Sequence, residues 1–205
     1  CIWKDGCQNI NDIKTTTPDV VPVTTYTGSE KEFNKEKIIA IAREPGYNDI
    51  PIQKLLAIAE VESSLEHFDS SGNVKGSKAG AVGLMQIEPK TGMGDCEMTV
   101  SDLENVDNNI RCGIKVLRNK KPLNMFEKRS YDCKAFTGVD SKGNTYSQPS
   151  ISKEYFGWER AYRGYNGWGC AGYYTSGSKI GDVIYADHTY VEKVRRAEVK
   201  YAGIT

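Results

Sequence analysis

The segment IPIQKLLAIAEVESS, residues 50–64, combines a strongly apolar helical pattern with two glutamates. Pro51 in the first turn suits a helix start, with Asn48 or Asp49 as the cap, and the helix is predicted to run to about Leu65. At about 100° per residue, four apolar residues fall within one arc of this helix: Ile52, Leu55, Leu56 and Ala59. Glu62 lies inside that arc and Glu60 at its edge, so the pattern predicts that Glu62 faces the protein interior.

An ionised carboxylate on an apolar face is costly unless it has a partner, and the usual response is a raised pKa. A carboxylic acid that stays protonated near neutral pH can serve as a general acid. Glu62 is therefore a candidate catalytic residue. The structural alternative is a salt-bridged residue at the margin of the apolar face.

The overall charge of the chain excludes several classes of partner. Its 205 residues contain 27 Lys and Arg and 27 Asp and Glu, which gives no net charge. This balance argues against a long-range field for nucleic acids or anionic membranes, although it leaves room for a local basic patch. No apolar run approaches the roughly 18–20 residues that cross a bilayer. We expect no nucleic-acid partner and no membrane-spanning segment.

The cysteines indicate an oxidising compartment. There are six, Cys1, Cys7, Cys96, Cys112, Cys133 and Cys170, and none forms a C-x-x-C pair. With only two histidines in the chain, a metal site is not expected, nor is a cofactor. The even count and wide spacing are typical of disulfides in a secreted, periplasmic or cell-surface protein.

We predict the pairs Cys1–Cys7, Cys96–Cys112 and Cys133–Cys170, the alternative being that some cysteines are small buried apolar residues. A chain beginning at Cys1 is typical of a processed or trimmed protein. A lipidated Cys1 would leave an odd number of thiols, so parity favours the disulfide.

Periodicity and turn residues predict a mostly helical domain with small hairpins. Residues 1–33, rich in Thr, Val and Pro, are predicted to form an extended arm or linker, and residues 34–205 the domain. Besides residues 51–65, helices are predicted at 31–44, 101–120 (with a capping box of Ser101 and Glu104), 154–167 and 188–203. Hairpins are predicted at 68–81 and around Gly143 and Asn144.

Five motifs occur in a recognisable order: VESS (61–64), AGAVGLMQIEPKTG (79–92), NNIRCGIKVL (108–117), AYRGYNG (161–167) and YVEKV (190–194). Together they resemble the soluble lytic transglycosylase domain, which shares a lysozyme-like fold with goose-type lysozymes. The resemblance spans about residues 47–197. It implies a mainly α, α+β lysozyme-like fold, with small hairpins around a groove for peptidoglycan glycan strands.

The resemblance also implies roles for individual residues. Glu62 corresponds to the single catalytic acid that protonates the oxygen between N-acetylmuramic acid and N-acetylglucosamine. Seven residues correspond to substrate-binding positions: Ser63, Gly83, Met85, Gln86, Tyr165, Asn166 and Tyr190. Without the resemblance, Met85 and Tyr165 would be interpreted as core residues, and Ser63 as a surface or helix-end polar residue.

The sequence departs from the family pattern at three places, of which one is the stretch 120–157, longer than the family typically needs. Trp168 in GYNGWG stands where a small residue is common, and it is either a platform for a sugar or a structural residue. The segment YADHTY before Tyr190 also differs, which puts that wall of the groove in doubt.

The lack of an evident second carboxylate favours transglycosylation, with release of 1,6-anhydromuramic acid ends. Glu88, with Asp69 as a remote candidate, could position water for hydrolysis by a goose-type-like muramidase. A non-catalytic wall-binding protein on this fold is disfavoured, because Glu62 and the candidate groove residues are all present. A disulfide-rich secreted toxin or adhesin would explain the cysteines but not the ordered motifs.

Overall fold

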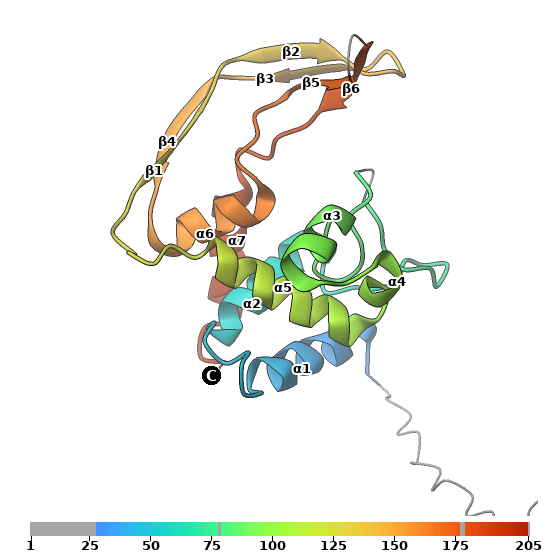
Figure 1. The fold of residues 1–205 in the computed structure, drawn as a ribbon, viewed down its shortest axis with the longest axis vertical. Coiled ribbons are helices and arrows are strands. Elements are labelled where there is room, and N and C mark those ends of the chain that lie inside the picture. Colours follow the sequence, from blue (N-terminus) through green and yellow to red (C-terminus); the bar gives the residue numbers. More distant parts are fainter. Residues whose placement is uncertain (1–27, 78, 177–178, 205) are drawn as a thin grey trace, which may run out of the picture.

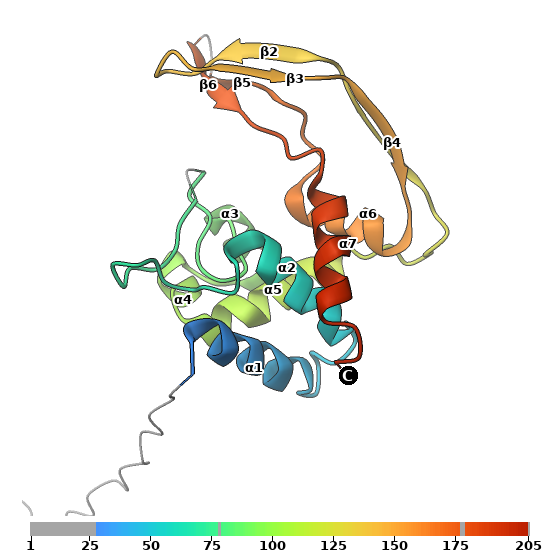
Figure 2. The ribbon, with the colours of Figure 1, turned by 180° about the vertical axis from the view of Figure 1, so that it is seen from behind.

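The computed structural model describes residues 28–77, 79–176 and 179–204. A compact helical body carries a long curved arm of β-hairpins, which arches over one side of the body (Figures 1 and 2). The predicted combination of helices and small hairpins is confirmed. The predicted Cys1–Cys7 pair and most of the predicted N-terminal arm lie outside the described residues.

Seven α-helices and one π-helical segment are found in the described residues. They are α1 (Glu30–Ala42), α2 (Ile52–Ser63), α3 (Pro89–Thr91), the π-helix Gly92–Cys96, α4 (Val100–Leu103), α5 (Val106–Lys120), α6 (Gly157–Asn166) and α7 (Tyr190–Lys200). In the described part of the chain, no helix has the length and apolar character needed to cross a membrane.

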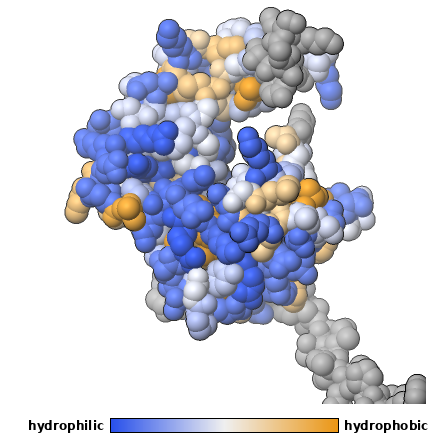
Figure 3. Space-filling model, viewed as in Figure 1, coloured by the Kyte–Doolittle hydropathy of each residue, from blue (hydrophilic) through white to orange (hydrophobic). Residues whose placement is uncertain are grey.

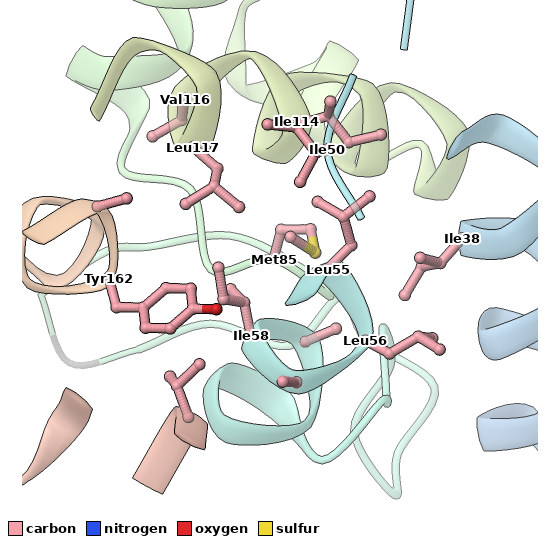
Figure 4. Packing of buried hydrophobic residues seen from close by; sticks show 14 of the residues in the cluster. Ile38, Ile50, Leu55, Leu56, Ile58, Met85, Ile114, Val116, Leu117 and Tyr162 are labelled. Carbon is pink, nitrogen blue, oxygen red and sulfur yellow. The ribbon is translucent and has the colours of Figure 1, made fainter. Parts of the chain in front are cut away.

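Helix α2 is the centre of the body. It packs against α1 and α7, and its apolar residues join the buried cluster in Figure 4. The predicted caps of this helix are wrong. Pro51 occupies the N-cap position without a side-chain hydrogen bond, and the Asp49 carboxylate instead binds the Arg118 guanidinium at 2.9 and 3.0 Å. The helix ends where Ser64 adopts a left-handed conformation.

The helix predicted over residues 101–120 is two helices. Thr99 and Asp102 form the capping box of α4, in place of the predicted Ser101 and Glu104. Asn105 then caps α5 by accepting hydrogen bonds from the next turn. The single apolar stripe hid this break, because Leu103 and Ile110 pack into the same core from both helices.

The arm consists of three two-stranded antiparallel sheets. Strand β1 (Arg129–Cys133) pairs with β4 (Ile151–Tyr155), β2 (Phe136–Val139) with β3 (Thr145–Gln148), and β5 (Gly172–Ser176) with β6 (Lys179–Ile184). The first two, β1–β4 and β2–β3, are successive parts of one long hairpin. The hairpin predicted around Gly143 is the β2–β3 turn. The other two strand pairs were not predicted.

Two of the predicted disulfides are present in the described residues. The Cys96–Cys112 bond fixes the π-helix to α5, and the Cys133–Cys170 bond joins the end of β1 to the loop after α6. The first therefore lies within the helical body, and the second ties the arm to it.

Candidate active site

The Glu62 carboxyl group lies at a pocket of about 330 Å³. The pocket is formed by the end of α2, the loop before α3, the end of α5 and the end of α6. Its lining residues with polar or charged side chains include Glu62, Gln86, Glu88, Lys120, Tyr165 and Asn166. This pocket is called the Glu62 pocket below.

Burial raises the pKa of Glu62 to about 7, and the nearby negative charge of Asp187 acts in the same direction. The Tyr190 hydroxyl donates a hydrogen bond of 2.5 Å to Oε1 of Glu62, which opposes this rise. At neutral pH the protonated and ionised forms are therefore both populated. A carboxyl group in this state can give a proton and take one back.

Glu60, two positions earlier in α2, has the opposite environment. Its carboxylate binds the Lys200 ammonium at 2.6 Å and accepts a hydrogen bond of 2.8 Å from the Tyr201 hydroxyl. These partners hold the pKa of Glu60 below its ordinary value. Glu60 is thus the surface carboxylate that the helical pattern predicts.

Two tyrosines enclose the carboxyl group of Glu62 on the side of α6 and α7. The Tyr165 hydroxyl donates to the main-chain oxygen of Met85 at 2.8 Å, and the Tyr190 hydroxyl donates to Glu62. Burial, together with the nearby Glu62, raises the pKa of both hydroxyls far above the ordinary value. Both tyrosines therefore stay neutral at any pH at which Glu62 titrates.

Arg163 is a site residue that the sequence did not reveal. Its side chain is 1% exposed and donates to the side-chain oxygen of Asn166 and to the main-chain oxygens of Gly167 and Asp187. The guanidinium also lies over the Tyr131 ring, at 4.6 Å from the centroid. Arg163 thereby fixes the Asn166 amide at the rim of the pocket. The sequence feature that could have indicated this role is an arginine on the apolar face of the helix, three residues before Asn166.

Gln86 lines the pocket from a strained turn. Its φ is 47°, and its Nε2 donates to the main-chain oxygen of Gly83 at 2.8 Å. The Asn109 side chain fixes the same turn: it accepts a hydrogen bond from the Met85 N–H at 2.7 Å and donates one to the main-chain oxygen of Val82 at 2.9 Å. The role of Asn109 was not predicted either.

Two residues expected in the groove, Met85 and Ser63, have buried side chains. The Met85 side chain is fully buried, among Leu55 and other core residues (Figure 4). Ser63 is 3% exposed and donates back to the Ala59 oxygen of its own helix at 3.1 Å. In this structure neither side chain lines the Glu62 pocket.

Gly83 is required for packing within the protein. Its φ is 73°, and a Cβ atom there would lie 2.6 Å from the His67 ring and 2.7 Å from the Asn109 amide. The expected close approach is therefore to these two side chains. His67 is itself fully buried: its Nδ1 accepts from the Leu84 N–H at 3.0 Å, and its Nε2 bonds the Glu104 oxygen at 2.8 Å.

The two candidate second carboxylates differ in position. Glu88 is exposed and lines the same pocket as Glu62. Asp69 does not line it, and its carboxylate instead accepts from the Ser71 and Asn73 N–H groups of a surface turn at 2.8 and 3.0 Å. Glu88 is therefore the one candidate, among the two considered, that can face a ligand bound beside Glu62.

Trp168 does not line the Glu62 pocket. Its ring packs edge-on against Tyr131 and Tyr155, and the Arg129 guanidinium covers it at 4.1 Å from the centroid. These contacts favour the structural interpretation of this residue.

Comparison with known families finds a match that covers the part of the chain around Glu62. The model of the transglycosylase SLT domain matches residues 39–135, a range that includes Glu62, Gln86 and Glu88. Tyr165 and Tyr190 lie beyond that range, and the fold brings them to Glu62. A search of curated proteins finds no match. Residues 39–135 thus match a transglycosylase SLT domain, and the helices with small antiparallel hairpins are consistent with its α+β lysozyme-like fold.

Proposed function

We propose that the protein is a peptidoglycan lytic transglycosylase that uses Glu62 as its single catalytic acid and base. The observation that carries the proposal is the environment of Glu62: a carboxyl group with a pKa of about 7, held by Tyr190 at the wall of a polar pocket. Glycan strands of peptidoglycan are the substrate that the family implies.

In the proposed reaction, protonated Glu62 gives its proton to the glycosidic oxygen between N-acetylmuramic acid and N-acetylglucosamine as that bond breaks. The acetamido oxygen of the substrate supports the anomeric carbon. Ionised Glu62 then takes the proton of the muramic acid 6-hydroxyl, whose oxygen forms the 1,6-anhydro bond. Proton transfer by such a group contributes on the order of 10²–10⁴-fold to the rate.

The other pocket residues have supporting roles in this proposal. Asn166, fixed by Arg163, and Gln86 offer amides to the acetamido group and hydroxyls of the sugar. Tyr165 and Tyr190 are neutral donors that orient the carboxyl group and the loop beside it. Of the sequence-predicted binding residues, these four are the ones we retain for direct or positioning contacts.

Hydrolysis by a goose-type-like muramidase is the second candidate, because Glu88 lines the same pocket as Glu62. If Glu88 positions a water molecule, water replaces the 6-hydroxyl as the attacking group. The two reactions break the same bond and differ only in what attacks the anomeric carbon.

Mass spectrometry of digested peptidoglycan tests both candidates. The wild-type protein is expected to release anhydro-muropeptides, which are one water lighter than hydrolysis products. Glu62→Gln should release none, and Glu88→Gln should leave the product type unchanged. Reducing-end products that disappear in Glu88→Gln would establish hydrolysis instead. Absence of any product from the wild type would contradict the enzymatic proposal.

The two disulfides support an oxidising compartment for the protein. We therefore propose that it acts outside the cytoplasm, where peptidoglycan lies.

A further inference from the structure

A second pocket, of about 350 Å³, adjoins the Glu62 pocket. It lies between the end of α5, the segment leading to β1, and α6, and it shares Lys120 and Gly164 with the Glu62 pocket. Its charged and aromatic lining residues are Lys120, Lys121, Glu127, Arg129, Arg160 and Trp168. We refer to it as the cationic pocket. Figure 3 shows that the surface over the end of α5 and over α6 is largely hydrophilic.

The charges of this pocket are unbalanced. Four cations line it with one carboxylate, that of Glu127, which binds Arg160 at 2.9 Å. In the described part of the chain, Lys121 and Arg129 form no ion pair, and their cationic groups lie over the Trp158 and Trp168 rings. A chain without net charge thus concentrates positive charge beside its candidate active site.

Close packing of α5 on α6 places one of these cations at the junction of the two pockets. A Cβ atom at Gly164 would lie 3.1 Å from Cβ of Lys120 and 3.5 Å from Nε1 of Trp168. The ion pair of Lys120 with Asp95 spans 3.9 Å, and the side chain is exposed. Lys120 therefore faces both pockets with its ammonium only weakly held.

We propose that the cationic pocket binds free carboxylates of the peptide attached to the muramic acid beside the cleaved bond. The proposal rests on the proposed function. Unmodified hexosamine units carry no charge, so a cationic extension of the pocket has no partner on the sugars themselves. The peptide on the muramic acid lactyl group carries free carboxylates, which lysine and arginine bind in a partly enclosed site.

The test compares two forms of one substrate. Peptidoglycan strands are acetylated at their free amines, and half of the material is then amidated at its free carboxylates with methylamine. Both forms keep the same glycan and the same peptide, but only the first keeps the negative charge. KM and kcat are measured on both forms for the wild type and the variants below.

The wild type is expected to show a KM about fivefold lower for the carboxylate form, because exposed charge pairs contribute modestly to binding. The double variant Lys121→Gln/Arg129→Gln should lose this preference, with kcat changed little. Arg129→Lys keeps the charge and should retain most of the preference. Lys142→Gln/Arg196→Gln removes the same charge at exposed sites outside both pockets, and should behave as the wild type.

Equal KM values for the two forms in the wild type would overturn the proposal. So would a double variant whose KM rises equally on both, since that result indicates a structural effect. If the wild type cleaves neither form, the proposed function fails, and sedimentation binding of Glu62→Gln to the two forms decides the present proposal. Preference for the carboxylate form would then support it, and equal binding would overturn it.

Discussion

Glu60 and Glu62 belong to the same helical turn, and their surroundings move their pKa values in opposite directions. Glu60 meets Lys200 and Tyr201 at the surface, whereas Glu62 meets Tyr190 in a largely enclosed site. The difference follows from the position of each residue on the apolar arc of α2. This contrast gives a test that does not depend on any substrate.

Glu62→Gln should stabilise the protein at alkaline pH. The folded-state pKa of Glu62 is raised to about 7, so its stabilising contribution is full below the unfolded-state pKa near 4.5 and is lost as pH rises through 7. Removing the charge should raise the free energy of unfolding at pH 8 by up to about 3 kcal/mol, with little change at pH 4.5. Urea unfolding at the two pH values measures the difference.

The matched control is Glu60→Gln. Its folded-state pKa is lowered, so its contribution is present above the unfolded-state pKa and is lost as pH falls. This variant should therefore be less stable than the wild type at pH 8. Equal effects of the two variants would show that Glu62 is not buried as the structure has it.

Tyr190→Phe should shift the pH dependence of cleavage. Since Glu62 must be protonated to act as an acid, wild-type kcat/KM should fall above about pH 7. The Tyr190 hydroxyl lowers the pKa of Glu62, so its removal should move this fall upward by up to about one pH unit. The rate of muropeptide release, followed from about pH 5 to about pH 9, measures both profiles.

Tyr201→Phe removes a comparable hydrogen bond, but from Glu60, and should leave the profile in place. A Tyr190→Phe profile that coincides with that of the wild type would show that this hydrogen bond does not tune the acid.

The sequence predicted the orientation of Glu62 because a helical arc needs only local spacing. The sequence placed Met85 and Ser63 in the groove, whereas both side chains are buried and do not line the Glu62 pocket. Whether a side chain lines a groove depends on packing between distant elements, which local spacing does not reveal. Arg163 and Asn109 were missed for the same reason: partners of both lie on other segments of the chain.

At the level of elements, helix positions were predictable and caps were not. Apolar periodicity located α1, α2, α6 and α7. The cap of α2 was not predictable, because the Asp49 carboxylate binds Arg118 on α5 and does not cap the start of α2. Two of the three strand pairs were missed because their strands are short, with no sustained alternation of apolar and polar residues. By contrast, two of the three predicted cysteine pairs, which joined neighbours along the chain, are present in the described residues.

The two observed disulfides should have different effects on stability. Cys96 and Cys112 are both buried, within the body, and lie 16 positions apart in the sequence, so Cys96→Ala/Cys112→Ala should lower the free energy of unfolding by about 3 kcal/mol. Cys133 and Cys170 tie the arm to the body. Their replacement should mainly speed amide hydrogen exchange in β1 and β4. If removing either disulfide sped amide hydrogen exchange in the helical body to the same extent, the two bonds would not have these separate roles.

For the whole molecule, the site belongs to the body and not to the outer part of the arm. The Glu62 pocket is lined by residues of α2, α5 and α6 and of the segment around α3. The β2–β3 hairpin packs on the β5–β6 region instead: the Val139 N–H donates to the Tyr173 hydroxyl oxygen at 3.1 Å, and the Gln148 amide donates to the main-chain oxygen of Ala186 at 2.7 Å. Figure 3 shows a hollow between the arm and the body.

Excision of residues 136–148, with an Asn-Gly turn joining Ala135 to Pro149, should therefore leave a folded body. The melting temperature should fall by less than about 5 °C, because the buried cluster draws on β1 and β4 but not on β2 and β3. On short soluble glycans kcat should stay within about twofold of the wild type, since no lining residue of the Glu62 pocket is removed.

Circular dichroism melting and product analysis measure these two quantities. Tyr173→Phe is the matched control, because it removes the hydroxyl contact of the arm with β2 and keeps the hairpin. A loss of kcat greater than about tenfold in a protein that still melts cooperatively would place the outer arm in the groove. In that case the substrate would have to occupy the hollow beneath the arm as well as the Glu62 pocket, and the arm would be part of the catalytic machinery.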